Sequence, residues 1–555
     1  MSSLQRPWLS NWPRDVPQSV NYPEISLSGI LHKSAVTAPN RAAILYHGTR
    51  IPYRRLDALA DRFGGALQDL GVKKGDRVAI YLPNIPQFVI AYYAALRAGA
   101  VVVAVSPLYK ERELAQILID SGAEVLVAWD RLYSYVQSVK DRTKLRHVIT
   151  TSIRDYLPPI PRIFSHLKGI ESYPCPIAYD MKTFLAEHDI GLSPADIQPK
   201  VDVALLQYTG GTTGTPKGAM LTHYNLVVNA AQFAGWLQMK PAKEVHLCAL
   251  PFFHIYGMTV AMNAPVYTST TMVLIPDPRD THSLLRAIDK YKPTIFCGTP
   301  TMYVGIINQQ DIQRYNLRSI RACVSGASGL PVEVQRNFEE LTGGRLVEGY
   351  GLTETSPVTH VNPLDDPSRN RPGSIGIPVS DTDAKIVDLE TGEHVLPSGT
   401  PGELVIHGPQ VMLGYWNKPD ETKTAFKNGW LHTGDIATMD PDGYFRIIDR
   451  KKDMINVSGL KVWPREVEEI LYEHPAVKEA AIIGVPDQRS GEAVKAFVVL
   501  KDEYRGKIAS EEITRFCKER IASYKAPRCI EFKDALPKSP VGKVLRRELR
   551  TQNTA

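Results

Sequence analysis

A run of glycine and threonine that ends in one lysine has the composition of a phosphate-binding loop. Its members are Thr209, Gly210, Gly211, Thr212, Thr213, Gly214, Thr215, Pro216, Lys217 and Gly218. The glycines let the backbone approach an anion closely, the threonines offer hydroxyl donors, and Lys217 adds a mobile charge. A P-loop NTPase needs Gly-x-x-x-x-Gly-Lys-Ser/Thr, but here Lys217 precedes its glycine and no Ser or Thr follows the pair. The spacing therefore favours a phosphate-binding loop of another family over a P-loop or a flexible linker.

The residues on either side of this run predict the elements that position it. Val203–Tyr208 is typical of a short buried strand, and Thr222 is placed to cap a helix that runs through Phe233. A strand, a glycine-rich loop and a helix N-terminus would together present N–H groups and a positive dipole end to an anion.

Most of the chain alternates short apolar runs with helical patterns, which predicts mainly parallel sheets with helices on both faces. A helix is expected over Pro331–Leu341, and strands over 43–46, 78–82, 101–105, 294–297, 322–325 and 346–348. Polar strings follow three of these strands directly, at Gly298–Thr301, Ser325–Gly329 and Gly349–Glu354. Because ligands of such sheets lie beyond the carboxyl ends of the strands, we expect these strings to meet the glycine-rich loop in one crevice.

Composition favours a cytoplasmic enzyme with several subdomains. The 555 residues exceed one core, and 65 basic against 59 acidic residues give a net charge of only +6, which argues against a nucleic-acid binder. The six cysteines are never spaced as C-x-x-C, so reduced thiols are expected. No signal peptide is recognised at the N-terminus. The apolar stretch Phe88–Val105 is interrupted by Arg97 and Gly99, which favours a buried helix and strand over a membrane span.

The pattern changes after about Pro372 to closely spaced strands, with a hairpin predicted around Asp440–Gly443. The charged, non-periodic run Asp449–Asp453 follows, and an amphipathic helix opens at Pro464. We expect a domain boundary in the charged run, giving domains 1–449 and 450–555; the alternative is an ordinary solvated loop.

Six strings in order along the chain resemble the motifs of the adenylate-forming superfamily, which includes acyl-CoA synthetases, peptide-synthetase adenylation domains and firefly luciferases. The strings lie at Tyr208–Gly218, Pro251–Gly257, Gly349–Glu354, Thr433–Asp435, Asp449–Gly459 and Pro537–Lys543. Among members, the chain is most similar to bacterial and archaeal fatty-acyl-CoA ligases, followed by plant coumarate-CoA ligases. The resemblance implies an α/β fold: a large N-terminal domain of doubly wound sheets with a small β-barrel-like subdomain, then a small mobile α+β C-terminal domain.

The resemblance also implies a two-step reaction with ATP, Mg²⁺ and CoA. A carboxylate and ATP give an acyl-adenylate and pyrophosphate, and the CoA thiol then displaces AMP. Thr209, Thr213 and Lys217 would hold the β- and γ-phosphates, within the loop that also contains Gly210, Gly211, Thr212 and Gly214. Thr353 would contact the α-phosphate, and Glu354 would bind Mg²⁺.

The nucleoside would be held by four further groups of the family pattern. Tyr350, between Gly349 and Gly351, would stack on adenine, while Gly326 and Ala327 leave room for it. Asp435 would bind both ribose hydroxyls, and Arg450 would support that end of the site.

The resemblance assigns the remaining residues to catalysis and to domain rotation. Lys543 would place its charge on the carboxylate and the α-phosphate during adenylation, although by position alone it could belong to a solvated basic helix. His254 would orient groups between the acyl and pyrophosphate pockets, with a packed core histidine as the alternative. Lys452 would be the hinge, and Gly459 would line the thiol tunnel unless it is only a turn glycine.

The sequence determines the substrate less well than the reaction. An acyl pocket is expected near Tyr256, Met258, Met262 and Cys297–Tyr303, which would accept a fatty acid or an aromatic acid. Tyr156–Lys168 mixes apolar and basic residues, which is typical either of a weak membrane-surface segment or of an inter-subdomain connection. An aryl-CoA ligase or a carrier-protein adenylating enzyme stays open as the second interpretation, before a kinase or ATPase and a non-catalytic binding protein. The oligomeric state stays open, a homodimer included.

Overall fold

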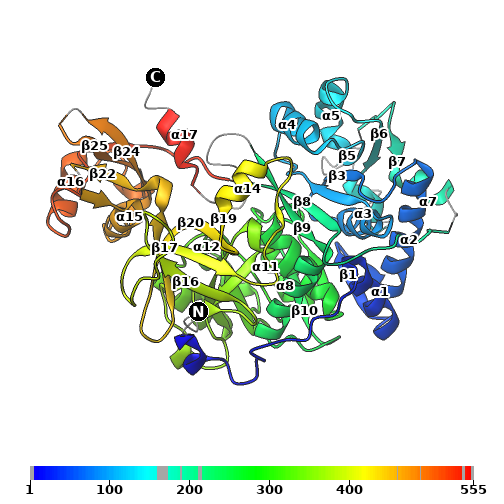
Figure 1. The fold of residues 1–555 in the computed structure, drawn as a ribbon, viewed down its shortest axis with the longest axis horizontal. Coiled ribbons are helices and arrows are strands. Elements are labelled where there is room, and N and C mark those ends of the chain that lie inside the picture. The colour runs from blue at the N-terminus through cyan, green and yellow to red at the C-terminus, as the bar shows by residue number, and fades with distance from the viewer. Residues whose placement is uncertain are drawn as a thin grey trace. The chain divides into compact units, whose positions relative to one another are not determined.

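The computed structural model describes residues 6–158, 173–187, 191–209, 216–458, 460–487, 489–539 and 544–551. The chain divides into two compact units, shown with their elements in Figure 1. The larger unit comprises Trp8–Asp383 and His407–Leu431, and the smaller unit comprises Met1–Pro7, Ala384–Ile406 and His432–Ala555.

An eight-stranded sheet of the larger unit has the order β18-β9-β8-β4-β3-β5-β6-β7. Its strands are β3 (Arg77–Tyr81), β4 (Val101–Ala104), β5 (Val125–Trp129), β6 (His147–Thr151), β7 (Tyr179–Asp180), β8 (Val203–Thr209), β9 (Lys217–Thr222) and β18 (Gly414–Tyr415). The pairs from β8 through β7 are parallel, whereas β9 and β18 are antiparallel additions. Helices α4 (Glu111–Ser121) and α5 (Tyr133–Lys140) bury Leu118 and Val136 in the same apolar cluster as Val103 and Leu126 of the sheet.

Two four-stranded sheets also belong to this unit, with orders β10-β11-β1-β2 and β12-β13-β14-β15. Their bounds are β1 (Ala42–Tyr46), β2 (Thr49–Pro52), β10 (Val245–Cys248), β11 (Thr271–Leu274), β12 (Ala322–Ser325), β13 (Arg345–Gly351), β14 (Val358–Val361) and β15 (Ile377–Pro378). Single bridges from Ile295 to His246 and to Ala322 join β10 to β12. The strand expected over 294–297 is therefore only this pair of bridges, whereas the other five expected strands are present.

The helices of the larger unit include those predicted over Pro331–Leu341 and after Thr222. They are α1 (Leu27–Thr37), α2 (Tyr53–Asp69), α3 (Pro86–Arg97), α7 (Met181–Glu187), α8 (His223–Trp236), α9 (Ile255–Met258), α10 (Ala264–Tyr267), α11 (Thr281–Tyr291), α12 (Pro300–Ile307), α13 (Val332–Thr342) and α14 (Pro419–Ala425). The apolar stretch that begins at Phe88 is buried helix α3 followed by buried strand β4, as predicted. Within the described ranges, no helix is both long and apolar enough to cross a membrane.

One local prediction is wrong. The glycine-rich loop does not lead into a helix N-terminus, because β9 lies between Lys217 and the capped helix α8 and pairs antiparallel with β8. Thr222 does cap α8 by accepting a hydrogen bond from Asn225 N, but a six-residue strand places that cap roughly 20 Å along the chain from Lys217. The helix dipole therefore does not serve this loop.

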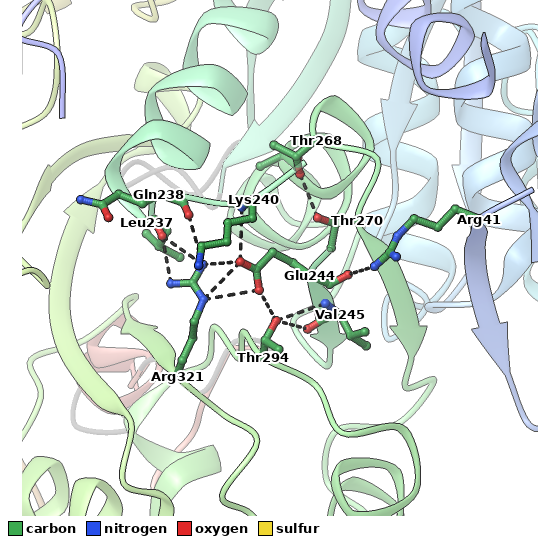
Figure 2. A network of polar contacts seen from close by, with 11 residues as sticks. Arg41, Leu237, Gln238, Lys240, Glu244, Val245, Thr268, Thr270, Thr294 and Arg321 are labelled. Atoms are coloured by element: carbon green, nitrogen blue, oxygen red, sulfur yellow. Dashed lines mark hydrogen bonds and ion pairs between the residues drawn. The ribbon is translucent and has the colours of Figure 1, made fainter. Parts of the chain in front are cut away.

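An ion pair between the buried Glu244 and the more exposed Arg321 joins loops of the larger unit that are far apart in sequence (Figure 2). Glu244 accepts a hydrogen bond from Arg321 Nη2 at 2.7 Å and others from Thr294 Oγ1 and Lys240 N. Arg321 also donates to Leu237 O at 3.1 Å, and Arg41 donates to the carbonyl oxygen of Glu244 at 2.6 Å. We call Arg41, Lys240, Glu244, Thr294 and Arg321 the Glu244 cluster. It fixes the loops that precede β1, β10 and β12.

The smaller unit contains β-rich and α+β parts. The sheet β16-β17-β20-β19, extended by β21, consists of β16 (Asp383–Val387), β17 (Gly402–His407), β19 (Phe426–Lys427), β20 (Trp430–Met439) and β21 (Phe445–Arg450); β19 and the first residues of β20 belong to the larger unit. The predicted hairpin is confirmed, since Met439 pairs with Phe445 and Gly443 N donates to Asp440 O.

The C-terminal part of the smaller unit is a second five-stranded sheet with three helices. Its members are β22 (Ile455–Val457), β23 (Leu460–Val462), β24 (Val477–Asp487), β25 (Gly491–Leu500), β26 (Cys529–Phe532), α15 (Pro464–Tyr472), α16 (Ser510–Lys518) and α17 (Arg546–Thr551). Val467, Ile482, Val498 and Ile513 share its apolar core. All six cysteines are free, in agreement with the prediction of reduced thiols.

Candidate functional site

The ends of the glycine-rich loop are the paired ends of two antiparallel strands. Thr209 closes β8 and faces Lys217, the first residue of β9. Residues Gly210 to Thr215 lie outside the described residues, so the predicted cradle itself is not described. The strand pairing nevertheless holds Lys217 and the hydroxyl-bearing Thr209 at one end of the eight-stranded sheet.

Tyr415 connects the lysine of this loop to the predicted magnesium ligand. The ammonium of Lys217 lies 5.4 Å from the centre of the Tyr415 ring, which is a cation–π contact. The hydroxyl of the same tyrosine donates a 2.7 Å hydrogen bond to Glu354 Oε1. Backbone pairing fixes the arrangement, because Tyr415 of β18 is opposite Ala219 of β9 and Met412 N donates to Glu354 O. A positive and a negative side chain thus share one aromatic neighbour.

Thr353 and Glu354 begin a short 3₁₀ helix, Thr353–Thr355, that follows β13. Gly349, Tyr350 and Gly351 form the end of β13 and pair with β14. The glycines are needed for close packing, since a Cβ on Gly351 would lie 2.0 Å from Pro357 O. The half-buried Tyr350 ring lies edge-on to His360 at 5.9 Å.

Gly326 and Ala327 follow β12, as predicted, but the space beside Gly326 is occupied by another side chain. A Cβ on Gly326 would lie 2.9 Å from the ring of Tyr256, whose hydroxyl donates to Val324 O at 2.9 Å. Ala327 has a φ angle of +70°, in the left-handed region. In this structure the space beside Gly326 is therefore filled by Tyr256. That Gly326 also leaves room for adenine stays a prediction.

His254 caps helix α9 rather than packing fully into the core. Its side chain is half-buried, and Nδ1 accepts a hydrogen bond from Tyr256 N at 3.2 Å. Because Nδ1 is an acceptor, Nε2 carries the proton in the neutral ring. Gln207 of β8 donates to Phe253 O at 3.0 Å, which holds this segment beside the strand that leads into the glycine-rich loop.

The predicted ribose ligand of the smaller unit forms a well-defined ion pair. Asp435 of β20 is opposite Arg450 of β21, and Arg450 Nε lies 2.8 Å from Asp435 Oδ1. The preceding residue is held by Glu403, which accepts a hydrogen bond from Gly434 N at 3.1 Å and ion-pairs with Lys451 at 3.2 Å. Glu403 was missed by the sequence analysis, although a single acid in the apolar strand Gly402–His407 is a recognisable signal.

The charged run Asp449–Asp453 is solvated only at Lys451 and Lys452, which are exposed. Asp449 and Asp453 are buried, and Lys451–Asp453 form a 3₁₀ helix. Partial desolvation and the neighbouring Arg450 lower the pKa of Lys452. Two other predicted residues, Gly459 and Lys543, lie outside the described residues.

Comparison with known proteins agrees with these motifs. Residues 31–416 match the family model of the AMP-binding enzymes, and residues 466–543 match that of the AMP-binding enzyme C-terminal domain. The chain belongs to the AMP-binding enzyme family. It is 45% identical over 561 residues to a long-chain-fatty-acid–CoA ligase of Bacillus subtilis, covering 99% of this chain and 98% of that protein. It is 41% identical over 564 residues to the enzyme of that name from Escherichia coli O6:H1, with the same coverage.

A solved structure supports the fold of this AMP-binding enzyme. The anthranilate CoA ligase AuaEII in complex with anthranoyl-AMP is 29% identical and superimposes with a TM-score of 0.83, covering 97% of this chain and 98% of that one. The predicted superfamily, the α/β fold class and the ligase class of enzyme are thereby confirmed. The roles of the individual site residues stay predictions.

The side chains at Glu354 suit a magnesium ion shared with phosphate oxygens. The described parts of the chain hold no cluster of three or more His, Cys, Asp or Glu side chains that could cage a metal. Mg²⁺ is commonly bound by one or two carboxylates together with substrate phosphates and water, so a single half-buried Glu354 is sufficient. Tyr415, which orients this carboxylate in the AMP-binding enzyme, could not be found from spacing because it lies far from both partners in sequence.

Proposed function

We propose that this AMP-binding enzyme is an ATP-dependent long-chain fatty-acyl-CoA ligase. It joins a fatty acid to CoA, with AMP and pyrophosphate as the other products. The observation that carries the proposal is the arrangement of Lys217 and Glu354 about Tyr415, which suits a triphosphate and its metal. The long-chain substrate is favoured by the full-length relatives that bear this name.

In the first step a carboxylate oxygen of the acid attacks the α-phosphorus, and pyrophosphate leaves. The carboxylate needs no general base because it is already ionised at neutral pH. Lys217 and Thr209 hold the β- and γ-phosphates, Thr353 contacts the α-phosphate, and Lys543 supplies positive charge where negative charge accumulates. Bound at Glu354, Mg²⁺ would neutralise phosphate charge. Asp435 accepts hydrogen bonds from the ribose hydroxyls while its ion pair with Arg450 orients it.

In the second step the CoA thiolate attacks the acyl carbonyl carbon, and AMP leaves with the electron pair of the broken C–O bond. Lys543 is not needed in this step, whereas the segment containing Gly459 lines the thiol passage. We infer that domain 450–555 rotates about Lys452 between the steps. The 3₁₀ helix Lys451–Asp453 and the buried carboxylates of Asp449 and Asp453 on either side of Lys452 support a defined pivot rather than a flexible linker.

A substrate panel tests the reaction and the acid together. AMP release is measured with acids from acetate to palmitate and coumarate, with and without CoA. We expect AMP, CoA-dependent turnover and the highest kcat/KM with long-chain acids. Release of ADP would indicate a kinase or ATPase. Preference for coumarate or anthranilate would establish the aryl-CoA ligase, which the likeness to AuaEII keeps as the second candidate.

Lys543→Ala separates the two steps. Loss of a charge contact made in the transition state should lower acid-dependent pyrophosphate exchange by roughly two orders of magnitude. The variant should still convert synthetic acyl-adenylate and CoA to thioester. Equal loss of both activities would contradict the assignment.

We also propose a weak attachment to membrane surfaces near Tyr156–Lys168. Residues 159–172 lie outside the described ranges, but the described residues that follow include the exposed Tyr173 and Ile177, at 39% and 70% exposure. Apolar side chains next to basic ones favour anionic interfaces. Co-sedimentation with phosphatidylglycerol vesicles, but not with phosphatidylcholine vesicles, is expected, and Ile177→Ser should weaken it. If the protein sediments with neither type of vesicle, the attachment is excluded.

A further inference from the structure

A buried group of five charged side chains connects the hinge segment of the smaller unit to its C-terminal helix. Arg546 Nη2 lies 2.8 Å from both carboxylate oxygens of Glu468, and Arg550 Nη2 lies 2.8 Å from Asp453 Oδ1. Arg546 Nη1 is also 3.6 Å from Asp453 and 3.9 Å from Asp449. We call Asp449, Asp453, Glu468, Arg546 and Arg550 the Arg546 cluster.

Four of the five members of this cluster are too buried for an ordinary surface network, and only Arg550 is more than a third exposed. The side chains of Asp449 and Asp453 are 1% and 7% exposed, and that of Arg546 is 20% exposed. Taking such charges out of water is costly, and an apolar substitute of the same volume would often be as stable. The cluster therefore needs another explanation than added stability, and its place in the chain provides one.

One side of the cluster belongs to the hinge segment. Asp449 and Asp453 flank Arg450 and Lys452, the predicted ribose-end residue and pivot. Asp449 also accepts hydrogen bonds from Arg450 N and Arg465 N, both at 2.7 Å, which ties the end of β21 to the start of α15. The carboxylates are thus fixed to the backbone on the hinge side.

The other side of the cluster lies just after the segment that contains Lys543, residues 540–543, which lies outside the described residues. Lys538 and Val544 form an antiparallel bridge, and Leu545 N donates to Pro537 O at 2.8 Å, so the described residues on both sides of this segment are paired. Arg546 follows directly and begins α17. Arg546 follows Lys543 by three residue steps, so their α-carbons are at most about 11 Å apart. Anchoring Arg546 therefore restricts where Lys543 can reach.

We propose that Arg546 is a positioning residue for adenylation. Its short bonds to Glu468 and its longer, adjustable contacts to Asp449 and Asp453 set the direction in which the chain leaves the segment containing Lys543, and thereby direct Lys543. The proposal rests on the role proposed above for Lys543. Apolar contacts hold α17 independently, since Leu549 is fully buried in a cluster with Ile483 and Phe497. Leu549 keeps the helix folded against the sheet, and Arg546 sets its direction relative to the hinge.

The guanidinium of Arg546 also has donors that are not used in hydrogen bonds to the described residues, which would allow it to bind a different carboxylate. Glu468 is held by two short contacts, whereas the contacts to Asp449 and Asp453 exceed hydrogen-bond length. Within the described residues, the buried Nε of Arg546 has no hydrogen-bond partner. When the hinge dihedral angles change, Arg546 can therefore move from one of the two carboxylates, Asp449 and Asp453, to the other. Its bonds to Glu468 remain in place during this exchange, so Glu468 stays paired.

The test compares Arg546→Met with Arg547→Met, its exposed neighbour on the same helix. Because a misplacement of about 1 Å can cost 100-fold, we expect Arg546→Met to lower pyrophosphate exchange about 10- to 100-fold. Thioester formation from supplied acyl-adenylate should change less than about twofold, and Arg547→Met should leave both rates unchanged. Arg546→Lys should retain part of the pyrophosphate exchange, because lysine keeps the positive charge but lacks the planar guanidinium that binds a carboxylate with two hydrogen bonds. Equal loss of both activities in a folded Arg546→Met protein would overturn the proposal.

A double-mutant cycle distinguishes positioning from an independent effect. If Arg546 acts through Lys543, Arg546→Met should have almost no further effect on exchange in the Lys543→Ala background. If the double variant loses exchange activity by the product of the two single-variant factors, the positioning role of Arg546 is overturned. The proposed role of Lys543 would remain intact. Normal exchange in Lys543→Ala alone would instead overturn the proposed role of Lys543 and this proposal with it. Should Arg546→Met fail to fold, Glu468→Gln, which removes the firm partner but retains Arg546, undergoes the same measurements.

Discussion

Two arginine–carboxylate clusters of this protein, the Glu244 cluster and the Arg546 cluster, differ in how their carboxylates are paired. In the Glu244 cluster one carboxylate is bound by one guanidinium, one hydroxyl and one backbone N–H, as Figure 2 shows. In the Arg546 cluster three carboxylates share two guanidinium groups, and some contacts are 3.6–3.9 Å long. The Glu244 carboxylate is therefore fully paired, whereas the carboxylates of Asp449 and Asp453 are paired with Arg546 only by long contacts. In both clusters one arginine Nε, that of Arg41 or of Arg546, has no hydrogen-bond partner among the described residues.

The pKa shifts of the two clusters have opposite directions. Burial alone would raise the pKa of Glu244, but hydrogen bonds from Arg321 and Thr294 outweigh it, and the pKa lies below its ordinary value. Burial raises the pKa of Asp449 to about 6 despite Arg546 and two backbone N–H donors. Complete pairing stabilises a charge in one fixed geometry, whereas incomplete pairing leaves a charge that a small movement can favour or disfavour. We infer that the first cluster is static and the second is adjustable.

The largest effect is expected from Glu244→Ala. The substitution leaves the buried part of Arg321 without its carboxylate, and breaking such a pair should lower the free energy of unfolding by about 3 kcal/mol. The denaturant midpoint of the larger unit measures the loss. Pyrophosphate exchange per folded molecule should stay normal; an altered KM for ATP at full stability would show that this cluster is not purely structural.

Asp435→Ala tests an ion pair proposed to serve the ligand rather than the fold. Loss of a charge-assisted acceptor for ribose hydroxyls should weaken ATP binding by roughly 1.5–3 kcal/mol, or about 10- to 100-fold. Calorimetry measures the affinity, and Asp442→Ala at the exposed tip of the same hairpin is the matched control. Equal ATP affinity in the two variants would mean that the ribose site is assigned wrongly.

Asp449→Asn should alter how stability depends on pH. A carboxyl whose folded pKa is raised contributes stability that is complete below its ordinary value of 3.8 and is lost as the pH rises through about 6. The wild type should therefore lose up to about 1.4 kcal/mol per pH unit relative to Asp449→Asn across this window.

The Glu244 carboxylate should show the opposite dependence. Its pKa is lowered, so its contribution is complete above its ordinary value of 4.5 and is lost as the pH falls further. Denaturant midpoints of unfolding are measured at pH 4, 5, 6 and 7 for the wild type, Asp449→Asn and Glu244→Ala. Parallel curves for wild type and Asp449→Asn would contradict the raised pKa.

The smallest effect is expected from Glu333→Ala, the same substitution as in the first prediction but in an exposed pair. Glu333 and Arg336 of α13 are 69% and 62% exposed, so water and salt screen their attraction. The change in unfolding free energy should be about 0.5 kcal/mol or less. If Glu333→Ala lowered the unfolding free energy as much as Glu244→Ala, burial of the carboxylate could not be the reason why the Glu244 pair matters more.

Local pattern predicted most elements because burial imposes a period on the sequence. Alternation and apolar runs located β3, β8 and β12, and Thr222 with Asn225 marked the start of α8. The same signals failed for Lys217–Thr222, which lacks a clear period and becomes a strand only by pairing with β8. The run 294–297 is a similar case, reduced to single bridges because its neighbours pair with it at one point each.

The sequence by itself determined the family and the chemistry, because those depend on residue types in an ordered set of motifs. It also located Asp435 and Arg450, whose strands are joined by a hairpin that Asp440–Gly443 encodes locally. Only the tertiary structure decided that Tyr415 lies between Lys217 and Glu354, that Tyr256 occupies the space beside Gly326, and that Arg546 faces the hinge carboxylates. These contacts join residues distant along the chain, and no local propensity specifies which distant charges or rings will be buried together.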